Sequence, residues 1–214
     1  MSQAANDVVD RDGQRPRAWQ RMLSGRRLDL LNPSPADIDI EDIAHGLARV
    51  ARWNGQTVGT HAFSVAQHSV LVADICDALA SDLTPQWRLA ALLHDAAEYV
   101  VGDLISPFKT AIGRDYKSFE LRLSASIHAA FGVPDPMPDA IAATIKHADG
   151  IAAYYEATRL AGFTEPEAAL YFPLAGDTLP SALRLEMDVL TAHETQAAQA
   201  AFLERFALLK TSVS

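Results

Sequence analysis

Apolar residues recur at helical spacing through most of the chain beyond residue 36, and no alternating strand pattern of useful length interrupts them. Proline and glycine mark the ends of these repeats, as where Pro138 opens one segment and Gly162 closes it. The pattern predicts helices over about 39–50, 61–80, 84–100, 106–113, 115–131, 138–160 and 180–210. Since 214 residues fit one domain, we expect an all-α, single-domain helical bundle.

Composition divides the chain into four parts. Residues 1–17 are polar and hold three aspartates and three arginines, which is typical of a flexible tail. Residues 18–35 mix apolar anchors with glycine and proline, which predicts an extended arm lying on the domain. We expect the functional core over 36–162, and a loop and C-terminal helix packed on that core over 163–214.

Overall charge limits the classes of partner. A formal net charge of −9 argues against binding to a nucleic acid polymer, because the phosphate backbone would repel it. No apolar run is long enough to cross a membrane, and the N-terminus has no hydrophobic segment of the kind a secretory signal contains. A single cysteine, Cys76, fits a reducing compartment, so we expect a cytoplasmic protein whose anionic ligand meets a local positive centre.

Three predicted helices carry ionisable residues on otherwise apolar faces. His94 and Asp95 interrupt the run LAALLHDAAEYV, and Glu98 follows His94 by four residues on the same helical face. His68 in FSVAQHSVLVADI and Asp149 in KHADGIAAYYEA also point inward by their spacing. Ionisable groups in such surroundings must be paired, metal-bound or neutralised.

Taken singly, each of these residues could be an ordinary hydrogen-bonded core residue, and Asp149 could cap a helix break at Gly150. Taken together, His68, His94, Asp95 and Asp149 predict a site with two imidazoles and two carboxylates, built from three helices. This donor set suits manganese, iron, cobalt, nickel or zinc, and the sequence does not choose among them. Glu156, two turns beyond Asp149, is expected to have at most an indirect role.

The chain resembles a known superfamily in four segments, which are Arg52-Trp53, FSVAQHSVLVA (63–73), LLHDAAEYVVGDLISP (92–107) and KHADGIAAYYEA (146–157). Their order is similar to that of the HD-domain metal-dependent phosphohydrolases, and most similar to bacterial 5′-deoxynucleotidases and related phage deoxynucleotide triphosphohydrolases. Gln67 stands where the family usually has glutamate, and Ile105-Ser106 departs from its Gly-Asp-Leu segment. Neither change alters a predicted ligand.

The resemblance implies a role for each site residue. One divalent transition metal, with magnesium as a further option, would be held by His68, His94, Asp95 and Asp149. Glu98 would position the attacking water and handle its proton, and Asp103 would contact water at the metal or the sugar. The substrate would be bound by Arg52 at its phosphate, Trp53 at its deoxyribose and His61 near its phosphate, or His61 would merely cap its helix.

The implied reaction is hydrolysis of a deoxynucleoside 5′-monophosphate to the deoxynucleoside and phosphate. The alternatives are a deoxynucleotide triphosphohydrolase, another HD phosphodiesterase, and an inactive module that only binds metal or nucleotide. Few basic residues are candidates for a polyphosphate, which mildly favours the monophosphate; beyond Arg52 they are His61, Lys109, Arg26 and Arg27. The resemblance also implies a homodimer, with the alanine-rich final helix as a candidate contact.

Overall fold

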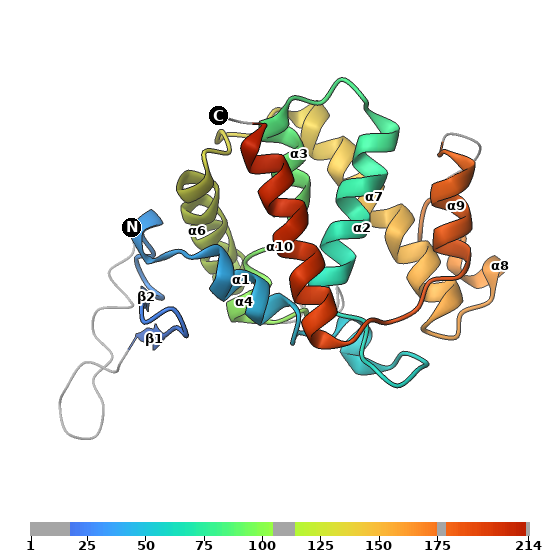
Figure 1. The fold of residues 1–214 in the computed structure, drawn as a ribbon, viewed down its shortest axis with the longest axis horizontal. Coiled ribbons are helices and arrows are strands. Elements are labelled where there is room, and N and C mark those ends of the chain that lie inside the picture. Colours follow the sequence, from blue (N-terminus) through green and yellow to red (C-terminus); the bar gives the residue numbers. More distant parts are fainter. Residues whose placement is uncertain (1–17, 105–113, 175–178, 213–214) are drawn as a thin grey trace.

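Nine helices dominate the computed structural model, which describes residues 18–104, 114–174 and 179–212 (Figure 1). They are α1 (Ile40–Leu47), α2 (Val65–Leu79), α3 (Pro85–Leu92), α4 (Glu98–Val101), α6 (Arg114–Phe131), α7 (Asp139–Arg159), α8 (Glu165–Ala168), α9 (Ser181–Asp188) and α10 (Thr195–Thr211). The prediction of an all-α, single-domain fold is confirmed. The predicted tail over 1–17 and the predicted helix over 106–113 lie outside the described residues.

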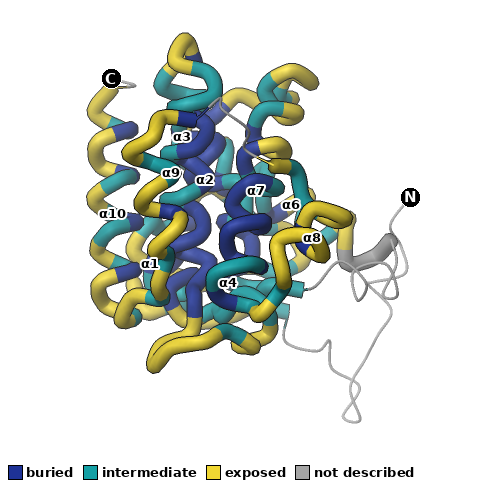
Figure 2. The backbone as a smooth tube through the Cα atoms, turned by 90° about the vertical axis from the view of Figure 1, so that its right-hand side faces the viewer, coloured by how far each residue is buried: buried dark blue, intermediate teal, exposed yellow. Residues whose placement is uncertain are grey.

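Helix α2 is the centre of the bundle and packs against α3, α7 and α10. Figure 2 shows α2 and α7 as largely buried, with the exposed surface on the outer helices. The Oγ of Ser64 accepts a hydrogen bond from the backbone N–H of Gln67, which fixes the start of α2 at Val65 rather than at residue 61. The central position of α2 places its polar residues deep inside the molecule.

Two long helices expected from the sequence are interrupted. The helix expected over 84–100 ends at Leu92, and a turn over residues 93–97 separates α3 from α4. The helix expected over 180–210 is divided into α9 and α10. At the second break, Gln67 donates to the carbonyl of Thr191 at 2.8 Å and accepts from the N–H of His193 at 2.9 Å. These bonds hold the linker away from helical geometry.

The arm forms a small hairpin that the sequence pattern did not predict, because each strand has only three residues. Strand β1 (Trp19–Arg21) pairs antiparallel with β2 (Arg27–Asp29), and Leu28 is fully buried in the core. Ser24 in the turn bonds both carboxylate oxygens of Asp42 on α1 through its N–H and its hydroxyl. The arm is therefore anchored to the bundle at both its strand and its turn.

The apolar face of α10 packs inside the chain, against α1, α2 and α3. Phe202 is fully buried and Phe206 and Leu209 nearly so, whereas Leu208 is exposed. This helix was the candidate dimer contact, and most of its apolar side is used within the monomer. The expected homodimer therefore gains no support from α10.

Candidate metal centre

Three parts of the chain bring the four predicted ligands together. His68 comes from α2, His94 and Asp95 from the turn over 93–97, and Asp149 from α7. Ligand atoms of His68, His94 and Asp149 all lie within 4.8 Å of one another. The Oδ2 of Asp95 lies 3.2 Å from the Nε2 of His94 and 3.5 Å from the Nε2 of His68. All four residues therefore face one point.

The orientation of the two imidazoles suits metal binding. Within the described residues, the Nε2 atoms of His68 and His94 are buried and have no hydrogen-bond partner. Their Nδ1 atoms are engaged, that of His94 with the carbonyl of Ala91 at 2.9 Å and that of His68 with Glu156 at 2.5 Å. Because a carbonyl only accepts, the proton of His94 lies on Nδ1 and leaves a lone pair on Nε2.

The interruption of the expected helix explains how neighbours in sequence share one site. On a continuous helix, His94 and Asp95 would diverge by about 100° and could not both face the same point. The turn over 93–97 removes that divergence, and the bond from the His94 ring to Ala91 fixes the imidazole at the end of α3. The two residues are therefore ligand candidates because the helix ends there.

The pKa of each ionisable group in the cluster depends on the charges of its neighbours. Burial opposes ionisation of Asp95 and Asp149, but the adjacent imidazoles outweigh it and hold the pKa of both carboxyls below their ordinary range. Burial and the charge of Arg52 lower the pKa of His68, but Glu156 and the aspartates raise it above its ordinary value overall. The carboxylates therefore stay ionised at neutral pH and favour a cation between them.

The two predicted catalytic carboxylates lie next to the ligands. Glu98 is the first residue of α4, is almost fully buried, and donates its backbone N–H to the carbonyl of Asp95 at 2.9 Å. Asp103 follows α4, and its Oδ2 lies 3.7 Å from the Nη1 of Arg52. The turn that presents Asp95 therefore also fixes where Glu98 begins its helix.

Arg52 and Trp53 begin the 3₁₀ helix η3 (Arg52–Gly55), where Trp53 has a φ of +57°. Positive φ is strained for a bulky side chain and persists only where its surroundings impose it. The Trp53 indole N–H donates to Glu156 at 2.9 Å, and its ring contacts Phe163 and Phe172 with centroids 5.8 and 5.9 Å away. These contacts hold the strained residue beside the metal centre.

Arg52 has a mostly buried side chain that points into the same cluster. Its Nε donates to Glu156 at 3.2 Å, and its Nη1 lies 3.8 Å from Asp95. Burial lowers the pKa of Arg52, but Glu156, Asp95 and Asp103 together raise it above its ordinary value. Its guanidinium therefore remains charged, and Glu156 is the carboxylate that lies nearest to it.

Glu156 is the functional candidate that sequence reasoning underrated. It is fully buried and bonds His68, Arg52 and Trp53, whereas the sequence predicted at most an indirect role. The available signal was a glutamate within the apolar run IAAYYEA, on the same face as Asp149. Such a residue must find partners, and its partners are the predicted site residues.

Other predicted contributors are not brought to the centre. His61 is exposed in the loop before α2, and takes no part in the hydrogen bonds and ion pairs that join the described cluster residues. Arg26 pairs with Asp39 at 3.1 Å, and the guanidinium of Arg27 stacks on Trp19. Lys109 lies outside the described residues. Both arm arginines are therefore committed elsewhere.

Together, the fold and site define a helical protein with a buried histidine–carboxylate centre of the kind that holds a divalent metal. Residues 65–160 match the HD domain. An uncharacterized protein of Rhodobacter capsulatus is 50% identical over 198 residues, which cover 92% of this chain and 98% of that relative. The chain therefore contains an HD domain.

HD domains are typical of metal-dependent hydrolases, so the match supports a general hydrolase role. The matched segment contains the four predicted ligands, Glu98, Asp103 and Glu156, whereas Arg52, Trp53 and His61 precede it. Across the described parts of the chain, no helix combines the length and apolar character needed to span a membrane.

Proposed function

We propose that this protein is a metal-dependent phosphohydrolase that converts a deoxynucleoside 5′-monophosphate and water into a deoxynucleoside and phosphate. The observation that carries the proposal is the pair of buried Nε2 atoms of His68 and His94, which lack hydrogen bonds and face the ionised Asp95 and Asp149. The substrate class comes from the resemblance of the sequence to 5′-deoxynucleotidases. The buried orientation of the donors supports the metal-dependent part.

The residues present fit a divalent metal. His68, His94, Asp95 and Asp149 would hold it, and mixed nitrogen and oxygen donors suit manganese, cobalt, iron, nickel or zinc, with magnesium as a further option. When bound, such a metal polarises a phosphoryl oxygen and makes water a better nucleophile near neutral pH. The excess of carboxylates around the centre favours the added positive charge.

The protein's own residues would supply orientation, proton transfer and charge. Glu98, buried at the start of α4, would orient the attacking water and accept its proton. Arg52 would offset charge developing on the phosphoryl oxygens, with Asp103 and Glu156 holding its guanidinium in place. Trp53 would pack on the deoxyribose. His61, exposed shortly before α2, would contact the phosphate.

Among the residues that the structure describes, the number of basic groups at the centre favours a monophosphate over a triphosphate. Arg52 is buried in the centre, and Lys146 reaches its edge through a 2.7 Å bond to Asp149. Arg26 and Arg27, which could have served a longer polyphosphate, are held in the arm. Triphosphate hydrolysis nevertheless uses the same central residues and is therefore an outcome of the test.

The test is phosphate release from a panel of deoxynucleoside and ribonucleoside monophosphates, deoxynucleoside triphosphates and cyclic nucleotides, with added Mn²⁺ or Co²⁺. We expect the deoxynucleoside monophosphates to be the best substrates. Glu98→Gln should lower kcat by about 10²–10⁴-fold, because general base catalysis contributes that much, while metal binding persists. Glu41→Gln, at an exposed position on α1, is the matched control.

Two results would contradict the proposal. Release of triphosphate, identified by mass, would assign the chain to the triphosphohydrolases. Binding of metal and nucleotide without hydrolysis of any compound would make it a binding module instead.

We also propose a homodimer, on the resemblance alone, and a cytoplasmic location, on the single cysteine. Light scattering at micromolar concentration should give twice the chain mass of 23.1 kDa. A monomer across the concentration range would remove that part of the proposal.

A further inference from the structure

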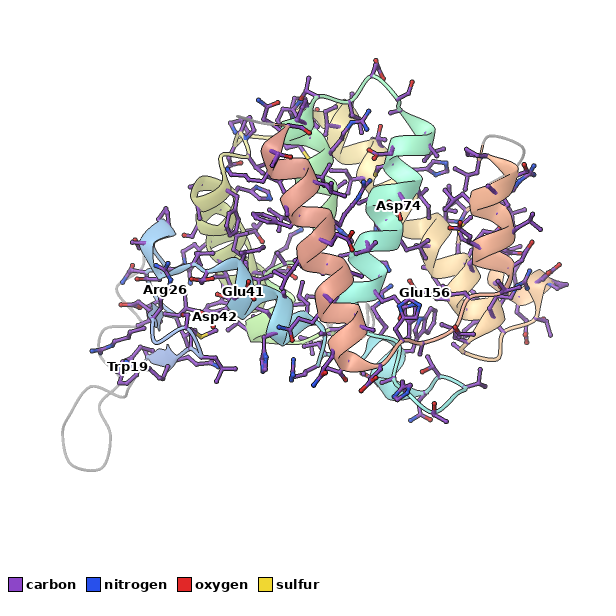
Figure 3. All side chains as sticks on the ribbon, in the orientation of Figure 1. Trp19, Arg26, Glu41, Asp42, Asp74 and Glu156 are labelled. Carbon is purple, nitrogen blue, oxygen red and sulfur yellow. The ribbon has the colours of Figure 1, made fainter. Side chains whose placement is uncertain are left out.

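The two carboxylate oxygens of Glu156 bond different groups of site residues. Its Oε1 bonds the Nδ1 of His68, whereas its Oε2 accepts from the Nε of Arg52 and the indole N–H of Trp53. The residue is fully buried on α7, and Figure 3 shows it among the side chains between α2 and α7. One side chain therefore contacts a predicted metal ligand and both predicted substrate-binding residues.

We propose that Glu156 is a positioning residue that couples the metal centre to the substrate-binding pair Arg52 and Trp53. Through Oε1 it orients His68 so that Nε2 faces the metal, and through Oε2 it fixes the guanidinium and the indole. The part concerning Arg52 and Trp53 rests on the proposed function, whereas the part concerning His68 needs only metal binding.

Only a carboxylate satisfies this arrangement of donors. The indole N–H and the guanidinium N–H can only donate. When the Nε2 of His68 binds a metal, the proton of the ring lies on Nδ1, which must then donate as well. A glutamine offers one acceptor oxygen, and its amide nitrogen would face a donor on one of the two sides. The isosteric Glu156→Gln change therefore loses the hydrogen bond to His68 or those to Arg52 and Trp53, depending on which way the amide points.

The strained backbone of Trp53 gives an independent reason for the coupling. Its φ of +57° is held by the bond to Glu156 and by aromatic packing against Phe163 and Phe172. Without the bond to Oε2, the backbone loses a contact that opposes its relaxation. The position of Trp53 thus reports on the same carboxylate that orients His68.

A simpler explanation is that Glu156 only neutralises the buried Arg52. The double variant Arg52→Met with Glu156→Leu separates the two, because it removes both charges and leaves His68 without its acceptor. Replacing a buried ion pair by apolar residues of similar size is often neutral for stability, so the double variant is expected to fold. If neutralisation were the whole role, this variant would bind metal as tightly as Arg52→Met alone.

The experiment measures metal affinity of the full-length protein by competition between Co²⁺ and a chelator, together with the visible spectrum of bound Co²⁺. We expect the double variant to bind Co²⁺ about 10–100-fold more weakly than Arg52→Met, as is usual when the partner of a ligating histidine is lost. Glu156→Gln should show the same loss of affinity where its amide nitrogen faces His68, or a shifted ¹H–¹⁵N resonance of the Trp53 indole, assigned with Trp53→Phe, where that nitrogen faces Trp53. Asp77→Asn, which removes another arginine-paired carboxylate, is the matched control and should change neither signal.

The outcomes are decisive whether or not hydrolysis is found. A Gln variant with both wild-type affinity and an unshifted Trp53 indole resonance, or an affinity in the double variant equal to that of Arg52→Met, overturns the proposal. If circular dichroism shows that the double variant is unfolded, the Gln variant decides by its two signals. A wild-type protein that binds Co²⁺ but cleaves no nucleotide would refute the proposed function while leaving the orientation of His68 by Glu156 open to this measurement.

Discussion

Helix α2 carries two charged clusters whose compositions differ. The arginine–aspartate cluster consists of Asp74 and Asp77 with Arg88 from α3 and Arg205 from α10. Its two acids are matched by two bases at 2.5–3.2 Å, and its side chains are partly exposed. Figure 3 labels Asp74 in this cluster and Glu156 in the metal centre.

In the metal centre, by contrast, the described carboxylates outnumber the arginine and lysine side chains, although Lys146 pairs with Asp149. Asp95, Asp103 and Glu156 all face Arg52, and Asp149 faces His68. The comparison teaches that ion pairs alone do not mark a functional site. In the arginine–aspartate cluster each aspartate is paired with an arginine, whereas an excess of buried carboxylates favours a cation from outside.

The largest expected effect tests this difference directly. Asp149→Asn should weaken Co²⁺ or Mn²⁺ binding by more than about 100-fold, since even the partners of ligands contribute about 10–100-fold. Asp74→Asn in the arginine–aspartate cluster should leave metal affinity unchanged, and cost at most about 1 kcal/mol of stability because its ion pair is partly exposed. Chelator competition and denaturant unfolding measure the two quantities. Equal metal affinity in the two variants would erase the distinction between the clusters.

The sequence was sufficient for the fold class and for a hypothesis about the ligands. Helical spacing predicts most of the helices, and the misfit of His68, His94 and Asp149 on apolar faces predicts that they meet. The prediction works because burial of an ionisable group is costly and must be explained locally. The roles of these residues stay predictions until metal binding is measured.

What the sequence could not supply depends on contacts between distant segments. The turn over 93–97 lies in a run of good helix formers, so local propensity favours a continuous helix there. The bonds from Gln67 to Thr191 and His193 join residues more than 120 positions apart. Likewise, Glu156 acquires its importance only when α7 is packed beside α2 and η3.

A second effect should come from the backbone that supports the metal centre. A Cβ added at Gly46 on α1 would lie 2.7 Å from the Cβ of Tyr99 and 3.2 Å from its Cα, beside Glu98 on α4. Gly46→Ala should therefore cost about 1–3 kcal/mol of stability by overpacking and lower activity by displacing α4, although alanine is the better helix former. Denaturant unfolding and phosphate release measure these effects.

Gly150→Ala is the informative comparison for Gly46. The added Cβ would meet Pro173 at 2.7 Å, but only at the Cδ and Cγ of a residue in a connecting segment. Since a segment outside the helices can shift more easily than a helix backbone, the loss of stability should be smaller than for Gly46→Ala. A larger loss for Gly150→Ala would show that the segment around Pro173, rather than α1, is the main support of the site.

The smallest expected effect concerns Cys76, whose thiol pKa is raised by an aspartate from each cluster. Burial raises the pKa of its thiol to about 12, and the charges of Asp77 and then Asp149 add to the increase. At pH 8 only about one thiol in 10⁴ is ionised at such a pKa, so a thiol reagent should react with Cys76 only as the protein unfolds. Because the chain has one cysteine, the reaction rate reports this thiol alone. Asp77→Asn should lower the thiol pKa slightly more than Asp149→Asn, as measured by titrating the thiolate absorbance of the folded protein. Rapid reaction of the folded protein at pH 8 would show that solvent reaches the interior between the two clusters. The solvent would then screen the effect of both clusters on the thiol pKa more than the structure indicates.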